Sequence, residues 1–215
     1  MVKGRLPADD SGLLNEAAGA SPESEQKAAS LPTAVSPSAE SPLAERLRIL
    51  GLMERDSVTG LANRRGFAIQ MAELFISDTQ HRPGALVLIE FTHFNAFNLE
   101  HGMQRGDELL RLAGEIVSRI WNNRLMVRAR IAEATFALGM NDMALEEVQE
   151  LGQMLRHGLA LQLSRGKYAK DADFRCGGAY FQRRATLPAL LVTAKQAIAR
   201  GRNNQENVFE LLSCG

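Results

Sequence analysis

Few side chains in this sequence have the type and spacing that catalysis or metal binding needs. His93 and His101 have one glutamate nearby, which could form part of a metal site, but this pattern is more typical of surface histidines. Arg64 and Arg65 could bind an anion or, as we favour, tie their loop to a sheet. The sequence contains no P-loop, no G-x-G-x-x-G after a strand and no G-x-S-x-G. These common motifs therefore assign no reaction.

The segment at 128–138, RARIAEATFAL, raises a separate question about chemistry that has been lost. It reads as two short strands joined at Ala132, Glu133 and Ala134, yet the joint has no Gly, Asn, Asp or Pro. Tight hairpins prefer those residues because their central positions often need a positive φ angle. Either the segment is not a hairpin, or the turn once had a role that glycine supported and its residues have changed.

The composition excludes several classes of partner. The 215 residues include 25 basic and 25 acidic side chains, so we expect no nucleic acid and no anionic membrane as partner. No apolar run reaches the roughly 18 residues of a membrane-spanning helix, and the N-terminus lacks the apolar core of a signal peptide. Cys176 and Cys214 form no C-x-x-C pair. These features predict a cytoplasmic protein, or the cytoplasmic part of a larger one.

Three parts follow one another along the chain. Residues 1–42 are rich in Ala, Ser, Pro and Glu and predict a disordered linker, because they bury too little apolar surface to offset their ordering entropy. Residues 43–55 predict a connecting helix, and residues 56–215 predict a folded domain. The helix has an apolar stripe that suits pairing with a second copy or packing on its own domain, and both alternatives stay open. The stripe consists of Leu43, Leu47, Leu50 and Met53.

The folded part alternates between helical and strand-like periods. Its most apolar run suits a strand buried on both faces, and the pair Gly177 and Gly178 marks a strand where a backbone or a ligand can come close. Aspartates are expected to begin two amphipathic helices, and a glycine to end a third. This order predicts an α+β domain with a mixed or antiparallel sheet. The expected elements are strands at 85–91, 172–181 and 207–212, helices that begin near Asp107 and at Asp142, and a helix at 187–201 that ends at Gly201.

Four stretches, taken in order and spacing over residues 50–212, resemble the GGDEF family, the diguanylate cyclase domain. The segment RDSVTGLANRRGF is similar to the family's D-x-LT-x-L-x-NRR-x-F motif. The segment IEFTHFNAFNLEHGMQRGDELL is similar to D-x-D-x-F-K-x-x-N-D-x-x-G-H-x-x-GD-x-x-L, and the third and fourth stretches are the hairpin and the GRN sequence at 201–203. The second stretch keeps Phe94, Asn98, Gly102, Gly106, Asp107 and Leu110.

The resemblance implies a nucleotidyl-cyclase-like palm, with a central, mostly antiparallel five-stranded sheet surrounded by helices. In that family two GTP-loaded domains face each other and together make cyclic di-GMP. The reaction needs hard divalent cations, usually Mg²⁺, held by carboxylates. The first and second aspartates of the family's D-x-D fall on Glu90 and Thr92, so Glu90 remains as a candidate metal ligand.

The signature loop departs most from the family. The positions of Gly-Gly-Asp-Glu-Phe hold, in order, Ala132, Glu133, Ala134, Thr135 and Phe136, so only the phenylalanine is kept. A Cβ in place of each glycine crowds the approach to the nucleotide, and Glu133 adds negative charge where phosphates belong. Both acids are lost, among them the partner carboxylate of Glu90. Because metal electrostatics drive phosphoryl chemistry, we expect no catalytic residue and no cyclase activity.

Other family positions are divided between kept and lost. Asn98 and Asp107 match the residues that read the guanine edge, and the alternative is a helix-capping pair around the loop between them. The family's phosphate-binding lysine and arginine fall on Ile198 and Arg202, so Arg202 is kept as a phosphate contact. The inhibitory product site, an R-x-x-D motif, falls on Asn-Arg-Leu-Met at 123–126 and is absent.

We therefore expect a degenerate GGDEF domain that is catalytically inactive and takes part in cyclic di-GMP signalling. It would act as a homodimer or as the partner of an EAL or sensor domain, with residual binding of GTP or cyclic di-GMP. It would require no cofactor, and Mg²⁺ would enter only with residual GTP binding. Three hypotheses stay open: a nucleotide-binding regulator, a pure interaction module and, as the alternative function, a weakly active diguanylate cyclase that makes cyclic di-GMP from two GTP.

Overall fold

A strand of branched apolar residues lies at the centre of the folded part. Strand β1 (Gly84–Thr92) is buried from Gly84 to Ile89 and again at Phe91, whereas Glu90 is exposed. This computed structural model describes residues 41–120, 126–165, 172–183, 185–201 and 209–215, so the linker predicted at 1–42 lies almost wholly outside the described residues. The prediction of a strand buried on both faces is confirmed, with Glu90 as the exception.

The sheet has five strands in the order β2-β3-β1-β4-β5. The pairs β1–β3, β1–β4 and β2–β3 are antiparallel, and β4–β5 is parallel. The predicted α+β fold with a mostly antiparallel five-stranded sheet is therefore confirmed. The four outer strands are β2 (Met126–Ala132), β3 (Thr135–Asn141), β4 (Asp173–Phe181) and β5 (Glu210–Ser213).

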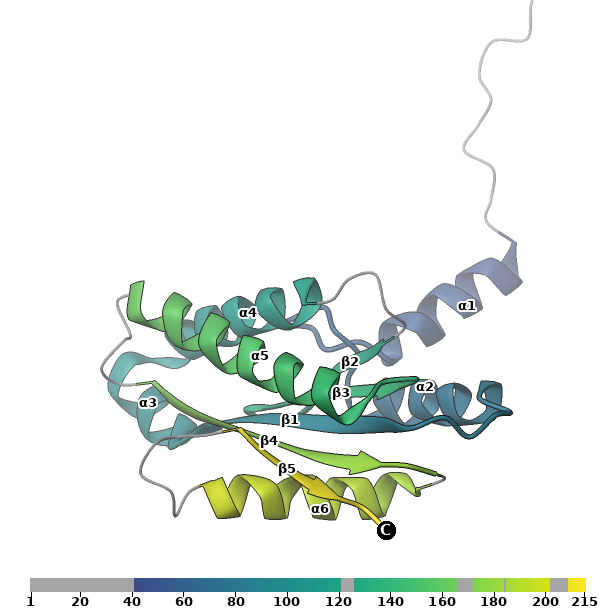
Figure 1. The fold of residues 1–215 in the computed structure, drawn as a ribbon. Helices are drawn as coiled ribbons and strands as arrows, with labels where there is room; N and C mark the ends of the chain where they lie inside the picture. Colours follow the sequence, from purple (N-terminus) through teal and green to yellow (C-terminus); the bar gives the residue numbers. More distant parts are fainter. Residues whose placement is uncertain (1–40, 121–125, 166–171, 184, 202–208) are drawn as a thin grey trace, which may run out of the picture. The chain divides into compact units, whose positions relative to one another are not determined.

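Helices cover both faces of this sheet (Figure 1). Because side chains alternate along a strand, Val87 and Ile89 pack against α3, α4 and α5, whereas Leu86 and Leu88 pack against α2 and α6. The site described below lies on the α2/α6 side. The bounds are α2 (Arg64–Ser77), α3 (Phe94–His101), α4 (Met103–Arg119), α5 (Leu145–Arg165) and α6 (Leu187–Gly201).

Helix α1 (Pro42–Met53) forms where the connecting helix is predicted. Ser41 caps it by accepting a hydrogen bond from the backbone N–H of Leu43 at 3.3 Å. Leu43, Leu50 and Met53 are exposed by 65%, 46% and 53%, and the side chain of Leu47 lies outside the described residues. The described part of the predicted stripe therefore does not pack on the folded domain. No helix in the described ranges combines the length and the apolarity that a membrane crossing requires.

Two predicted helix starts are wrong. Helix α4 begins at Met103 and not near Asp107, because Gly102 (φ 86°) lets the chain pass directly out of α3. Helix α5 begins at Leu145 and not at Asp142, which has a left-handed φ of 58° and instead forms an ion pair with Arg82 at 2.7 Å. The glutamate Glu147 accepts the N–H of Ala144 at 2.8 Å and so marks the start of α5.

Candidate functional site

Three side chains form a row across the end of β1, on the face that α2 and α6 cover. Glu90 pairs in register with Thr135 on β3 and with Arg175 on β4. Since Leu86 and Leu88 pack against α2 and α6, the alternation of the strand turns Glu90 to the same side. Directly opposite residues of an antiparallel pair have Cβ atoms about 5 Å apart. Glu90 therefore lies between a hydroxyl and a guanidinium.

A hollow of about 430 Å³ opens over this row and is called the cationic hollow below. Glu90, Thr92 and His93 line it from the end of β1, Arg175 from β4 and Lys195 from α6. Among the described residues, Glu90, Arg175 and Lys195 have no hydrogen bond and no ion pair with one another or with any other side chain. The described part of the hollow thus has two cations and one carboxylate that no described side chain engages.

The glycine pair of β4 sets the position of Lys195. A Cβ at Gly177 would lie 2.6 Å from the backbone nitrogen of Ile198, so glycine lets the backbone of α6 approach the strand. Ile198 is buried in the core at this contact, and Lys195 lies one helical turn earlier. Gly177 therefore serves the close approach of a backbone, one of the two roles predicted for the glycine pair, whereas a Cβ at Gly178 would first meet the side chain of Leu211.

The segment RARIAEATFAL is a hairpin. Strands β2 and β3 pair from Met126 to Ala132, with a register shift between Arg130 and Ala132, and the chain turns at Glu133 and Ala134. The described residues other than glycine with positive φ are His81, His93 and Asp142, so this turn forms without one. The register shift leaves one extra residue on β2, and this bulge lets the chain turn without a glycine.

One arginine ties the turn of the hairpin to the loop before α2. Arg130 donates to the carbonyl oxygen of Glu133 through Nε at 3.0 Å and Nη2 at 2.6 Å, and to Asp56 through Nη1 at 2.9 Å. Asp56 also accepts the backbone N–H and the hydroxyl of Thr59 at 2.9 and 2.8 Å. Burial raises the pKa of Asp56, but the hydrogen bonds from Thr59 and the charge of Arg130 outweigh it and hold that pKa below its usual value.

Arg64 and Arg65 do not have the role favoured from the sequence. Both are exposed at the start of α2, and within the described ranges neither side chain has a hydrogen bond or an ion pair. The loop is tied to the sheet by Arg130, and α2 is capped by Asn63, which accepts the N–H groups of Arg65 and Gly66 at 3.0 Å each. The preference for a loop-tying role is therefore wrong.

A second hollow, of about 250 Å³, lies between the tip of the hairpin and the start of α3. Glu90 and Glu133 line it, together with His93 and Thr135. We call it the acidic hollow because its charged side chains are carboxylates. His93 has a left-handed φ of 55° and is exposed, as predicted for a surface histidine. His101 is not a surface residue, because its ring packs on Phe97 with 4.6 Å between ring centroids.

The donors at the end of β1 do not fit a pair of divalent cations. Within the described residues, no group of three His, Cys, Asp or Glu side chains is placed to hold a metal ion. The neighbours of Glu90 in the row are Thr135, which has no charge, and Arg175, whose charge repels a cation. Glu90 by itself supplies too little negative charge for two-metal chemistry, although it stays a candidate ligand for one ion.

Asn98 lies in α3 and Asp107 in α4, on either side of Gly102, which joins the two helices. Asn98 Oδ1 is buried without a hydrogen-bond partner, and it packs against Gly106, where a Cβ would collide with it. Asp107 is half-buried and lies 3.8 Å from Arg111. Helix α4 has no side-chain cap, so the alternative of a helix-capping pair is wrong. A buried amide oxygen without a partner is the kind of group that a bound ligand satisfies.

Two predicted positions lie wholly or partly outside the described residues. They are the phosphate contact Arg202 and the absent product site at 123–126, of which Met126 is described and is buried at the start of β2. Arg175 and Lys195, in contrast, were missed by the sequence reasoning. Lys195 could have been found, because it lies one turn before Ile198 on the predicted helix. Arg175 could not, since only the strand register brings it beside Glu90.

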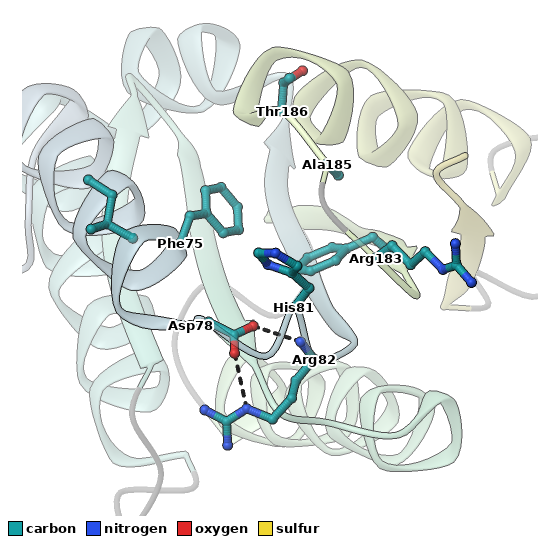
Figure 2. Close-up of a pocket in the computed structure, with 9 residues that line it drawn as sticks. Phe75, Asp78, His81, Arg82, Arg183, Ala185 and Thr186 are labelled. Atoms are coloured by element: carbon teal, nitrogen blue, oxygen red, sulfur yellow. Dashed lines mark hydrogen bonds and ion pairs between the residues drawn. The ribbon is translucent and has the colours of Figure 1, made fainter.

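At the opposite end of β1, Asp78 and Arg82 line a hollow of about 330 Å³ and are bonded to each other (Figure 2). Its apolar wall includes Phe75 and Phe181, whose rings meet edge to face at 5.9 Å. Asp78 accepts the backbone N–H of Arg82 at 2.8 Å and its Nε at 3.1 Å, and Arg82 also reaches Asp142. These contacts fix the loop that leads into β1.

Comparison with known proteins places most of the chain in one family. Residues 53–208 match the profile described as "Diguanylate cyclase, GGDEF domain". An uncharacterized protein of Bacillus subtilis (strain 168), YhcK, is 24% identical over 158 residues, which are 71% of this chain and 44% of YhcK. The chain thus spans less than half the length of this curated relative.

Solved structures share the fold. Vibrio cholerae LapD, as its S helix, GGDEF and EAL portions bound to c-di-GMP, superposes with a TM-score of 0.63 at 18% identity over 79% of this chain and 39% of that chain. The coiled coil and GGDEF domain of DgcB from Caulobacter crescentus, in complex with c-di-GMP, superposes with a TM-score of 0.62 at 20% identity. This match covers 79% of this chain and 91% of the DgcB chain. At these identities the likeness is one of fold.

Proposed function

The chain belongs to the GGDEF domain family, and from that premise we propose that it is a catalytically inactive member that binds a guanine nucleotide and acts in cyclic di-GMP signalling. The observation that carries this proposal is the row at the end of β1. There Glu90 has Thr135 on one side and Arg175 on the other, so no second carboxylate in the row joins it in holding metal ions. Without bound metal ions, the attack of one GTP on another loses its main source of electrostatic stabilisation.

The hairpin supports the same proposal. Its tip carries Glu133, whose charge repels phosphates, and its backbone is held by Arg130 in a turn that needs no glycine. Ala134 is buried in the core, and Thr135 is the side chain that faces Glu90. The framework of the loop is thus kept while its acids are gone.

Retained nucleotide binding is supported by a different set of residues. Asn98 offers a buried amide oxygen without a partner, and Asp107 lies on the other side of Gly102. An amide and a carboxylate together satisfy the donors and acceptors of a guanine edge. The proposal assigns no required cofactor, and Mg²⁺ would enter only together with GTP. It places the domain in the cytoplasm, where guanine nucleotides are available.

We also propose that α1 pairs with a second copy of itself, or that the domain serves as the partner of an EAL or sensor domain. Leu43, Leu50 and Met53 are apolar side chains of α1 that are left exposed. Exposed apolar stripes on a helix favour association with another helix. Sedimentation of the chain should show a dimer, and Leu50→Asp should shift it to the monomer. A monomer before substitution would contradict self-pairing.

The alternative is a weakly active cyclase, and one observation favours it. Glu90 and Glu133 both line the acidic hollow, so two carboxylates are available to one cation there. Mg²⁺ sites often use only one or two carboxylates in addition to the substrate phosphates.

The experiment that separates the two functions is a turnover assay. The chain is incubated with GTP and either Mg²⁺ or Mn²⁺, and cyclic di-GMP is measured by chromatography and mass spectrometry. We expect no product at any protein concentration. Product that disappears in Glu90→Gln, but persists in the matched surface variant Glu73→Gln, would establish the alternative.

A further inference from the structure

The cationic hollow carries more positive than negative charge on the side chains that line it. Arg175 and Lys195 face it from β4 and α6, and among the described lining residues Glu90 is the one carboxylate. The nearby Asp173 does not line the hollow, and its carboxylate accepts the hydroxyl hydrogen bond of Thr92 at 2.9 Å. Such a hollow attracts an anion and repels a divalent cation.

Arg175 is placed by the strand register and not by a salt bridge. It pairs with Glu90 across β1 and β4, yet no ion pair joins the two side chains, and the rest of the described chain offers Arg175 no other partner. The other arginines of the hairpin region are engaged: Arg130 holds Asp56 and the turn, and Arg128 donates to the carbonyl oxygen of Ile120 at 2.8 Å. The guanidinium of Arg175 can therefore donate a bidentate pair of hydrogen bonds to a phosphate.

Lys195 supplies the second cation from the opposite wall of the hollow. The close packing of α6 on Gly177 holds the helix that carries Lys195 against β4. The distance between α6 and β4 at the hollow is therefore set by backbone contact. Lys195 has no partner among the described side chains. A flexible ammonium suits a phosphate chain whose position varies.

We propose that the cationic hollow binds the phosphate chain of a nucleoside triphosphate directly through Arg175 and Lys195, without a divalent cation. The proposal rests on the proposed function, in which a guanine nucleotide still binds. It follows from the disagreement between this site and a two-metal centre: the row contains a guanidinium where a metal site needs negative charge. The two side chains provide the positive charge that metal ions provide elsewhere.

Isothermal titration calorimetry of the whole chain tests this proposal. GTP is titrated in Mg²⁺ and, separately, in EDTA at the same ionic strength, and inorganic tripolyphosphate is titrated in EDTA. We expect the dissociation constant for GTP in EDTA to lie within about threefold of that in Mg²⁺. We also expect tripolyphosphate to bind in EDTA. Binding of GTP that vanishes in EDTA would overturn the proposal, and so would the absence of binding by either probe.

Variants identify the residues. Arg175→Ser and Lys195→Gln should each weaken GTP binding in EDTA about tenfold, because each removes a charge-assisted contact with a phosphate. Arg65→Ser is the matched control, since it removes an exposed arginine whose side chain has no partner among the described residues and does not line the hollow, so it should bind as the original chain does. Circular dichroism verifies that each variant is folded. Equal affinity of Arg175→Ser and Arg65→Ser would contradict the assignment.

Failure of this proposal can be told apart from failure of the proposed function. The final mixture of each titration in Mg²⁺ is analysed for cyclic di-GMP. Product would overturn the inactive role whatever the titration shows. Binding that depends strictly on Mg²⁺, without product, would overturn the metal-free site and leave the inactive role in place.

Discussion

The charged side chains compared at the two ends of strand β1 differ in whether they are bonded to one another. At its start, Arg82 is bonded to both Asp78 and Asp142. Asp78 is only 6% exposed. At its end, Glu90, Arg175 and Lys195 lie around one hollow, and the structure of the described residues pairs none of them. Charges that are bonded within the protein stabilise its fold, whereas unbonded charges around a hollow are available to a ligand.

The contrast predicts which substitutions affect stability and which affect binding. The largest loss should follow removal of a bonded charge, and Arg130 beside the turn of the hairpin is the clearest case. Arg130→Ala leaves the carboxylate of Asp56 and the carbonyl oxygen of Glu133 without their donor. We expect the free energy of unfolding to fall by about 3 kcal/mol. Urea unfolding followed by circular dichroism measures it, and a loss no larger than that of Arg65→Ala would contradict the account.

A smaller loss should follow Gly177→Ala. The added Cβ would lie 2.6 Å from the backbone nitrogen of Ile198, so α6 must shift away from β4. We expect a cost of about 2 kcal/mol, as for other overpacked sites, together with weaker GTP binding because Lys195 moves with α6. Gly158→Ala is the matched control, since its Cβ would meet nothing closer than 3.8 Å. Normal stability of Gly177→Ala would show that α6 is not seated on this glycine.

Acid should lower the free energy of unfolding by protonating two bonded carboxylates, Asp56 and Asp78. Burial raises the pKa of Asp56 and of Asp78, but hydrogen bonds from Thr59 and Arg130 in one case, and from Arg82 in the other, leave both pKa values below the usual 3.8. A carboxyl whose pKa is lowered by folding stabilises the fold above its unfolded pKa and loses this contribution as pH falls through its folded value.

We therefore expect stability to decline below about pH 3.8, and Asp56→Asn to remove part of this decline. Unfolding curves at a series of acidic pH values measure the effect. An identical pH dependence in the variant would show that Asp56 carries none of it.

The smallest effect on stability is expected for the charges of the cationic hollow, which have no bonds among the described residues. Arg175→Ser removes a charge without a described partner, so the free energy of unfolding should change by less than about 0.5 kcal/mol. The same urea unfolding experiment applies. A loss comparable to that of Arg130→Ala would mean that Arg175 serves the fold, and the distinction between bonded and unbonded charges would fail.

Much of the fold could be predicted from local pattern, because buried strands and amphipathic helices leave regular periods in the sequence. The flanking strands of the hairpin also carry this signal, but its turn residues left the hairpin open until the resemblance to the family placed the signature loop there. The starts of α4 and α5 were predicted wrongly. Gly102 precedes α4 in place of Asp107, and Glu147 marks the start of α5 in place of Asp142. Aspartate is common at helix starts, but a cap depends on backbone geometry that the residue type does not determine.

The candidate site was less predictable than the fold. The positions of Glu90 and Thr135 followed from the resemblance to the family, but the neighbour Arg175 depends on the pairing register of β1 and β4. Strand register joins residues far apart in sequence, and no local pattern encodes it. The place of Lys195 depends in turn on how closely α6 approaches Gly177.

One measurement tests the central claim, which is that the domain binds GTP and does not convert it. GTP is titrated calorimetrically into the chain in Mg²⁺, and the mixture is then incubated and analysed for cyclic di-GMP. The account predicts a saturable heat of binding and no product. Cyclic di-GMP in the mixture, or the absence of any binding heat at millimolar GTP, would contradict it.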